Sequence, residues 1–172
     1  MRQEVLRPVD VAVALALARS PGQGYEPLAE KLGISLSTAH QAVQRLISAG
    51  LVGKDRQVHP QMLLQFLTYG VRHAFFAEPG PEVRGVPTAH AGPPLAEEIL
   101  AEDKYVWPSA RGEVRGAAIP PLYDGAPELA ERAPELYRAL TLVDALRVGR
   151  ARERELAREK LEAWLEGPGP PS

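Results

Sequence analysis

Residues 25–52, with the sequence YEPLAEKLGISLSTAHQAVQRLISAGLV, decide the fold of the N-terminal part of this chain. Glu26–Leu32 has the apolar spacing of a short helix with one buried side. Gly33 suits a tight turn, because glycine adopts a positive φ at little cost. Ser35 can cap a second helix that runs to about Ala49, since its hydroxyl accepts from the first unpaired backbone N–H groups. The stretch therefore predicts two short helices joined by a tight turn.

The second of these helices has one apolar and one polar face. Its apolar positions follow the spacing i, i+4, i+7 and i+8 and are Ala39, Val43, Leu46 and Ile47. Its polar positions are Ser37, Thr38, His40, Gln41, Gln44 and Arg45. Gly50 ends the helix, and Leu51-Val52 begins an extended segment. We expect the helix to pack on one side and to present hydrogen-bonding groups on the other.

These residues resemble a known family of DNA-binding proteins. The segment LAEKLGIS, the Ser-x-Ser-Thr at 35–38 and the ending at Leu46, Gly50, Leu51 and Val52 are similar to the winged helix-turn-helix of bacterial transcription regulators, the MarR-like group in particular. The resemblance covers about residues 9–60. It implies that the second helix enters the major groove of DNA. It leaves open a protein-binding role, because winged helices also serve as protein-binding modules.

The resemblance and the polar face together predict the DNA contacts. The expected residues are Ser35, Ser37, Thr38, His40, Gln41, Gln44 and Arg45 on the helix, with Lys54 and Arg56 in a wing whose tip spans 53–56. A glutamine amide can contact adenine through two hydrogen bonds. Arg45 lies late in the helix, so we expect it on phosphate. Lys54 and Arg56 meet phosphate or a minor groove, or are solvated charges on a turn.

The flanking segments are mostly helical. Val9–Arg19 is apolar on nearly all sides, which predicts burial under the helix-turn-helix or against a partner chain. Further helices are expected at 61–72, 134–148 and 151–166, and 73–77 either ends the first of these or forms a strand. Gly149 either separates the last two of these helices or leaves them continuous. Residues 167–172 read as a frayed tail.

The middle of the chain is rich in proline, with ten of the 17 prolines in residues 78–134. This density excludes long regular elements and predicts an irregular layer. A short helix is expected at 95–102 and a short strand at 105–107. The sequence Glu-Val-Arg-Gly occurs at 82–85 and again at 113–116. The two copies are either related strand-turn elements packed on each other or a chance similarity.

The expected fold class is mainly α with a small β wing. We divide the chain into a winged helix-turn-helix domain with its following helix (1–77), the Pro-rich middle region (78–127) and C-terminal helices with a tail (128–172). The middle and C-terminal parts depart from the MarR-like pattern, in which the wing is usually longer and no Pro-rich layer intervenes.

Composition and charge narrow the class of protein. The net charge of −2 excludes a generally basic nucleic-acid coat, and 45% hydrophobic residues indicate a globular chain. Residues 1–60 carry seven basic and five acidic residues, whereas 61–146 carry seven and twelve. We therefore expect modest, salt-sensitive DNA binding through the N-terminal part. The chain has no cysteine and no signal-peptide pattern, which favours a cytoplasmic protein.

No pattern of catalytic residues stands out. The four histidines lack metal-ligand spacing, and the chain contains neither a Gly-rich phosphate loop with its lysine nor a Gly-x-Ser-x-Gly turn. We expect no enzyme, no metal and no cofactor.

The function we expect is that of a DNA-binding transcription regulator acting as a homodimer. The dimer would form through the C-terminal helices or the buried first helix. The main alternative is a protein-interaction module or antitoxin-type regulator, because LVDALRVGRARERELA (142–157) is similar to regulators encoded beside nucleotidyltransferase-like toxins. The acidic middle region would suit a basic, toxin-like partner. A third alternative is a regulator that senses a small molecule.

Overall fold

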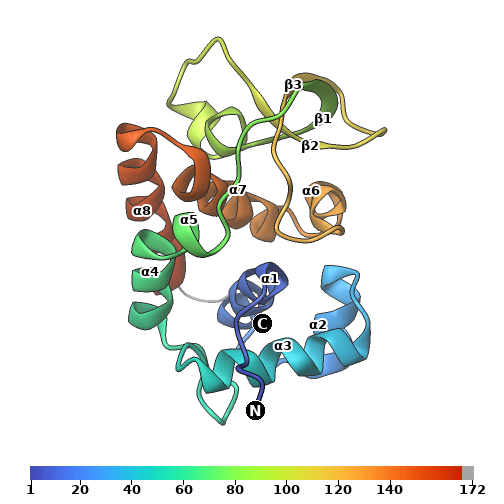
Figure 1. The fold of residues 1–172 in the computed structure, drawn as a ribbon, viewed down its shortest axis with the longest axis vertical. Helices are drawn as coiled ribbons and strands as arrows, with labels where there is room; N and C mark the ends of the chain where they lie inside the picture. The colour runs from blue at the N-terminus through green and yellow to red at the C-terminus, as the bar shows by residue number, and fades with distance from the viewer. Residues whose placement is uncertain (168–172) are drawn as a thin grey trace.

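The computed structural model describes residues 1–167 as an N-terminal helix-turn-helix below a lobe of helices and a small sheet (Figure 1). The helix-turn-helix consists of α1 (Pro8–Arg19), α2 (Tyr25–Leu32) and α3 (Leu36–Ser48). The lobe contains α4 (Pro60–Tyr69), α5 (Val71–Ala74), α6 (Leu129–Arg132), α7 (Pro134–Val148) and α8 (Ala151–Glu166). The expectation of a mainly helical fold with a small wing is confirmed.

Local signals in the sequence set the helix-turn-helix boundaries. Pro8 occupies the first turn of α1, where its missing N–H is not needed. Gly33 ends α2 in the left-handed conformation, with φ at 71°. Ser35 caps α3, and its hydroxyl accepts from the backbone N–H of Thr38 at 3.0 Å. The turn and the cap are therefore where the sequence predicts them.

The wing is minimal. Its two arms meet at a single antiparallel bridge between Val52 and Val58. Gly53 donates to the carbonyl of Gln57 at 2.8 Å, and Arg56 adopts a positive φ of 65° at the tip. These contacts make the wing a short, tight turn.

Glycines mark the helix boundaries that the sequence did not decide. Gly70 separates α4 from α5, and residues 75–81 continue without a strand. Gly149 takes an extended conformation with φ at −79° and ψ at 165°, so α7 and α8 are separate helices. The tail expected at 167–172 lies, except for Gly167, outside the described residues.

The Pro-rich middle is more regular than the sequence suggested. Its three strands are β1 (Glu82–Thr88), β2 (Tyr105–Pro108) and β3 (Val114–Ala118), and they close into a small barrel. β1 is antiparallel to both others, while β2 and β3 are parallel. The strands are short, with seven, four and five residues, and they contain only two prolines, Pro87 near the end of β1 and Pro108 at the end of β2. Prolines near strand ends remove few ladder hydrogen bonds, so the proline density did not prevent a sheet. The helix expected at 95–102 is only a 3-10 turn at Leu95–Glu97, and similar turns lie at Ala89–Ala91 and Ala126–Glu128.

The two Glu-Val-Arg-Gly copies are paired strands. Arg84 of β1 lies opposite Arg115 of β3, and Arg115 forms an exposed ion pair with Glu82 at 3.6 Å. Both glycines sit where another strand's backbone comes close. A Cβ on Gly116 would lie 2.6 Å from the carbonyl oxygen of Lys104, and one on Gly85 would meet that of Trp107. The structure therefore shows the two copies packed on each other, which is one of the two alternatives that the sequence allowed.

A single hydrophobic core joins the helix-turn-helix to the lobe. Helix α1 lies at its centre, and Val11–Leu17 are at most 2% exposed. The hydroxyl of Tyr123 donates to the carbonyl of Leu32 at 2.9 Å, which ties the end of α2 to the loop that follows β3. Because α1 is buried within its own chain, the alternative in which the first helix forms the dimer interface is wrong, and the alternative with the C-terminal helices stays a prediction. Within residues 1–167, no helix has both the length and the apolar character needed to cross a membrane.

Candidate nucleic-acid interface

The exposed face of α3 is a row of uncharged polar side chains. Ser37, His40, Gln41 and Gln44 are exposed, while Ala39, Ala42, Val43 and Leu46 are buried against the other helices. The amide Nε2 of Gln41 lies 3.4 Å from the hydroxyl of Ser37, at the long end of hydrogen-bond range. The row therefore presents donors and acceptors in the pattern that base edges can match.

Ser35 and Thr38 form the cap of α3. Besides accepting from the N–H of Thr38, the Ser35 hydroxyl donates to the Thr38 hydroxyl at 2.8 Å. The remaining N–H groups of the first helical turn have no intrahelical partner and point along the positive end of the helix dipole. This end of α3 therefore suits a phosphate.

Three elements meet at Tyr25. The ring of His40 on α3 stacks on the Tyr25 ring, with centroids 3.7 Å apart and planes at 19°. The guanidinium of Arg56 in the wing lies 4.9 Å from the same ring and donates to the carbonyl of Gln23 at 3.0 Å. This cluster fixes the wing against α3, so Arg56 is held before any DNA arrives.

Arg45 has a structural task that the sequence did not show. Its guanidinium is buried and donates twice to Asp10 of α1, through Nε at 2.8 Å and Nη2 at 2.9 Å. Asp10 also accepts from the N–H of Arg7 at 2.8 Å. The hydrogen bond to Asp10 raises the pKa of Arg45 above its ordinary value, more strongly than burial lowers it. Arg45 therefore holds α3 on α1, and the expectation that it contacts phosphate is corrected, because its guanidinium is buried on Asp10.

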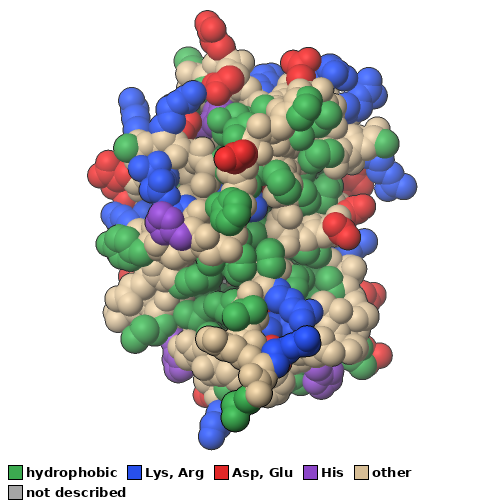
Figure 2. Space-filling model, in the orientation of Figure 1, with side chains coloured by type: hydrophobic (Ala, Val, Ile, Leu, Met, Phe, Trp, Pro, Cys, Tyr) green, Lys and Arg blue, Asp and Glu red, His purple; other side chains and the backbone are tan. Residues whose placement is uncertain are grey.

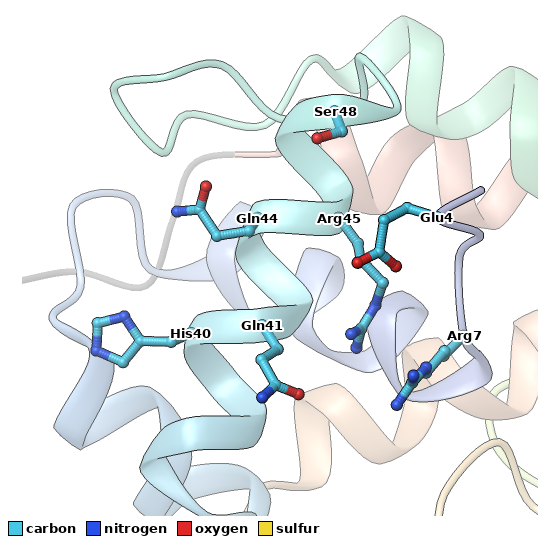
Figure 3. Close-up of a pocket in the computed structure, with 7 residues that line it drawn as sticks. All are labelled: Glu4, Arg7, His40, Gln41, Gln44, Arg45 and Ser48. Atoms are coloured by element: carbon cyan, nitrogen blue, oxygen red, sulfur yellow. The ribbon is translucent and has the colours of Figure 1, made fainter. Parts of the chain in front are cut away.

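The N-terminal arm runs beside α3 and encloses a hollow with it (Figure 3). The hollow has a volume of about 430 Å³ and is lined by Glu4, Arg7, His40, Gln41, Gln44, Arg45 and Ser48. In Figure 3 Arg7 and Glu4 come from the arm on one side of the hollow, and the glutamines come from the helix on the other. Arg7 thus brings an exposed cation to a helix face whose own arginine is buried.

Lys54 is exposed at the wing tip, with Asp55 next to it. Together with Arg7 and Arg56 it gives cations on two sides of the polar row of α3. The face therefore combines hydrogen-bonding groups at its centre with cations at its edges.

Comparison with known proteins assigns this part of the chain to a class. Residues 10–52 match a family model described as winged helix-turn-helix DNA-binding. The matched segment runs from Asp10 through α1, α2 and α3 to the first arm of the wing. This segment is therefore similar to winged helix-turn-helix DNA-binding domains. No curated protein and no solved structure matches the chain.

Sequence reasoning missed Glu4, Arg7 and Ser48 of this face. The arm has no helical periodicity, so nothing in its pattern places it beside α3. One signal was available, because Asp10 is an acidic residue within an otherwise apolar helix. A buried carboxylate requires a partner, so Asp10 predicts a basic or hydrogen-bonding residue packed against this helix.

Proposed function

We propose that this chain is a transcription regulator that binds operator DNA as a homodimer, in the manner of MarR-like winged-helix proteins. Helix α3 reads the major groove, the wing and the arm contact the backbone, and two copies place two recognition helices on a two-fold operator.

The observation that carries the proposal is the polar row of α3. Ser37, Gln41 and Gln44 share one exposed helix face, and the helix itself is anchored from behind by the Arg45–Asp10 pair. A rigid helix whose outward side chains are short or amide-bearing can approach base edges closely. In this proposal Gln41 or Gln44 contacts adenine, and Ser37 contacts a base or a phosphate.

The cations at the edges supply the sequence-independent part of the affinity. Arg7, Lys54 and Arg56 are proposed phosphate contacts, and each neutralised phosphate adds to the salt dependence of binding. Glu4 lies in the same hollow and opposes phosphate, so the arm favours an orientation in which Arg7 faces the backbone. The few cations predict modest affinity for one protomer, which two protomers on one operator would raise.

The test is fluorescence anisotropy with DNA from upstream of the protein's own gene and with scrambled DNA, at two salt concentrations. Preference for the upstream DNA that survives higher salt supports the proposal. Weak binding without sequence preference that disappears with salt would sink it and favour the protein-interaction alternative.

The variant Gln41→Ala tests base reading directly. It should relax specificity at one base position and cost about 1–3 kcal/mol of binding free energy. Glu159→Ala, at an exposed position of α8, is the matched control and should leave binding unchanged. Equal losses on upstream and scrambled DNA would contradict base reading by this residue.

A further inference from the structure

A stripe of exposed apolar side chains runs along α4 and α5. Met62 is 54% exposed, Tyr69 is 73% exposed and Phe76, just after α5, is 77% exposed. Gln65 is exposed between the first two, and the spacing of Met62, Gln65 and Tyr69 keeps these three side chains on one side of α4. In Figure 2 separate hydrophobic side chains protrude at the left edge of the molecule, over α4, and a broader hydrophobic patch lies nearer the centre. We call Met62, Gln65, Tyr69 and Phe76 the α4 stripe.

The segment that bears the α4 stripe is almost free of charge. No Asp, Glu, Lys or Arg occurs from residue 57 to residue 71, although 24% of the whole chain is charged. The cores of protein interfaces are depleted of charged residues and enriched in Tyr, Phe and Met. A partner recognised through opposite charge would find nothing to pair with on α4.

One end of the stripe is hollow and the other end carries the aromatic side chains. A hollow of about 640 Å³ lies between the end of α3 and the start of α4, and it is lined by Ala49, Gly50, His59, Pro60, Gln61 and Met62. Tyr69 lies seven residues beyond Met62, about 10 Å along the helix at 1.5 Å per residue. The molecule thus carries a hollow and a protruding aromatic side chain on one continuous face.

We propose that the α4 stripe is the contact between two copies of this chain, with α4 of one copy antiparallel to α4 of the other. A two-fold axis near Gln65 then brings Tyr69 of each copy to the hollow beside Met62 of the other. Contact across a two-fold axis requires that a surface complement itself, because residue i meets residue j and j meets i. The hollow and Tyr69 meet that requirement.

Gln65 also fits a position on the axis. An amide carries both a donor and an acceptor, so it can pair with an identical group, whereas a charged residue there would meet its own charge. This proposal rests on the proposed function in one respect: the dimer serves to place two copies of α3 on DNA. Ala49 and Gly50 end α3 and line the hollow, so the contact would fix each recognition helix relative to the axis.

The chain has no cysteine, which allows a direct test. Facing helices pack with axes about 8–10 Å apart, so cysteines near the axis come within disulfide reach. Gln65→Cys should form a covalent dimer on mild oxidation, seen on a non-reducing gel. Glu159→Cys, on an exposed face of α8, is the matched control and should stay largely monomeric. Equal cross-linking of the two variants would overturn the proposal.

Sedimentation at micromolar concentration supplies the second test. The wild-type chain should sediment as a dimer and Tyr69→Asp as a monomer with unchanged circular dichroism, because Tyr69 is exposed and supports no core packing. A monomeric wild-type chain, or a dimer that persists in Tyr69→Asp, would count against this interface. A dimer that binds no operator DNA would instead contradict the proposed function and would not contradict the proposed interface.

Discussion

Two buried Asp–Arg pairs hold the two halves of this molecule, and they are built differently. Asp10 and Arg45 join α1 to α3 in the helix-turn-helix, with the two residues 35 positions apart. Asp144 and Arg147 lie one turn apart on α7 in the lobe, at 2.8 Å. Both carboxylates are only 1% exposed. The first pair bridges two helices, whereas the second is local to one helix.

The Asp144–Arg147 pair also forms hydrogen bonds with other segments of the lobe. Asp144 accepts from the hydroxyl of Thr88 at 2.7 Å and from the indole N–H of Trp107 at 2.6 Å, which attaches β1 and β2 to α7. Arg147 donates to the carbonyls of Phe75 at 2.9 Å and Pro120 at 3.1 Å. This network attaches the barrel to α7.

The two buried pairs have different roles. Buried ion pairs add little net stability over apolar packing, but loss of one partner is costly. In the lobe the pair satisfies donors and acceptors from four segments. In the helix-turn-helix it sets the position of one helix, the helix that presents the polar row.

The largest effect is expected at Asp144. In Asp144→Ala, Arg147, Thr88 and Trp107 lose their common acceptor inside the core, so the free energy of unfolding should fall toward the upper end of about 3–5 kcal/mol. Urea denaturation followed by circular dichroism measures this loss. Asp124→Ala, at an exposed aspartate, should stay within about 0.5 kcal/mol of wild type. A loss below about 1 kcal/mol at Asp144 would show that the network does not hold the barrel.

Arg45→Ala should cost somewhat less, toward the lower end of about 3–5 kcal/mol. Arg45 lines the hollow beside α3, so water can reach Asp10 once the side chain is removed. The double variant Asp10→Leu/Arg45→Met should recover most of the stability, because apolar replacement of both partners leaves no unpaired charge.

The same double variant separates the two roles of Arg45. If the pair only positions α3, the double variant should bind operator DNA nearly as wild type does. A persistent affinity loss with a flatter salt dependence would instead restore Arg45 to the phosphate contacts.

Alkaline pH should weaken the lobe through Tyr137. Burial raises the pKa of Tyr137 to about 12, and its hydroxyl donates to the carbonyl of Pro87 at 2.6 Å. The unfolded chain ionises near pH 10 and the folded chain only near 12, so the stabilisation is complete below pH 10 and is lost as pH rises to 12. The slope should be at most about 1.4 kcal/mol per pH unit for this residue.

Tyr137→Phe supplies the control for this pH dependence. Denaturation at several pH values from 9 to 12 should show a shallower decline in the variant than in wild type. Tyr123 contributes in the same direction, because burial raises its pKa as well, and it remains in the variant. Identical slopes in the two proteins would mean that Tyr137 ionises freely in the folded chain.

The smallest effect is expected at the wing tip. Lys54→Ala should leave the free energy of unfolding unchanged, because the side chain is exposed. It should reduce the slope of log affinity against log salt by about one unit on every DNA sequence. Lys104→Ala, at an exposed position just before β2, is the matched control and should leave the slope unchanged. An unaltered slope in Lys54→Ala would remove the wing tip from the proposed interface.

Local chemistry explains which elements the sequence could predict. Gly33, Ser35 and Gly50 act on their own neighbours in the chain, so the turn and the boundaries of α2 and α3 followed from the sequence. The barrel was not predicted because its pairing joins positions about 30 residues apart, such as Arg84 and Arg115. The repeat of Glu-Val-Arg-Gly hinted at two related strands, yet no local pattern specifies their register.

The polar row of α3 was likewise predictable from helical spacing, and the burial of Arg45 was not. By itself the sequence determined the helix-turn-helix, its cap and turn, and the uncharged polar face, because these depend on residues within a few positions of one another. Tertiary structure alone decided that Arg45 supports α3 through Asp10, that Arg7 joins the face, and that Tyr69 shares one surface with a hollow. These depend on contacts between distant segments, which form only when the shared core brings α1, α3 and the lobe together.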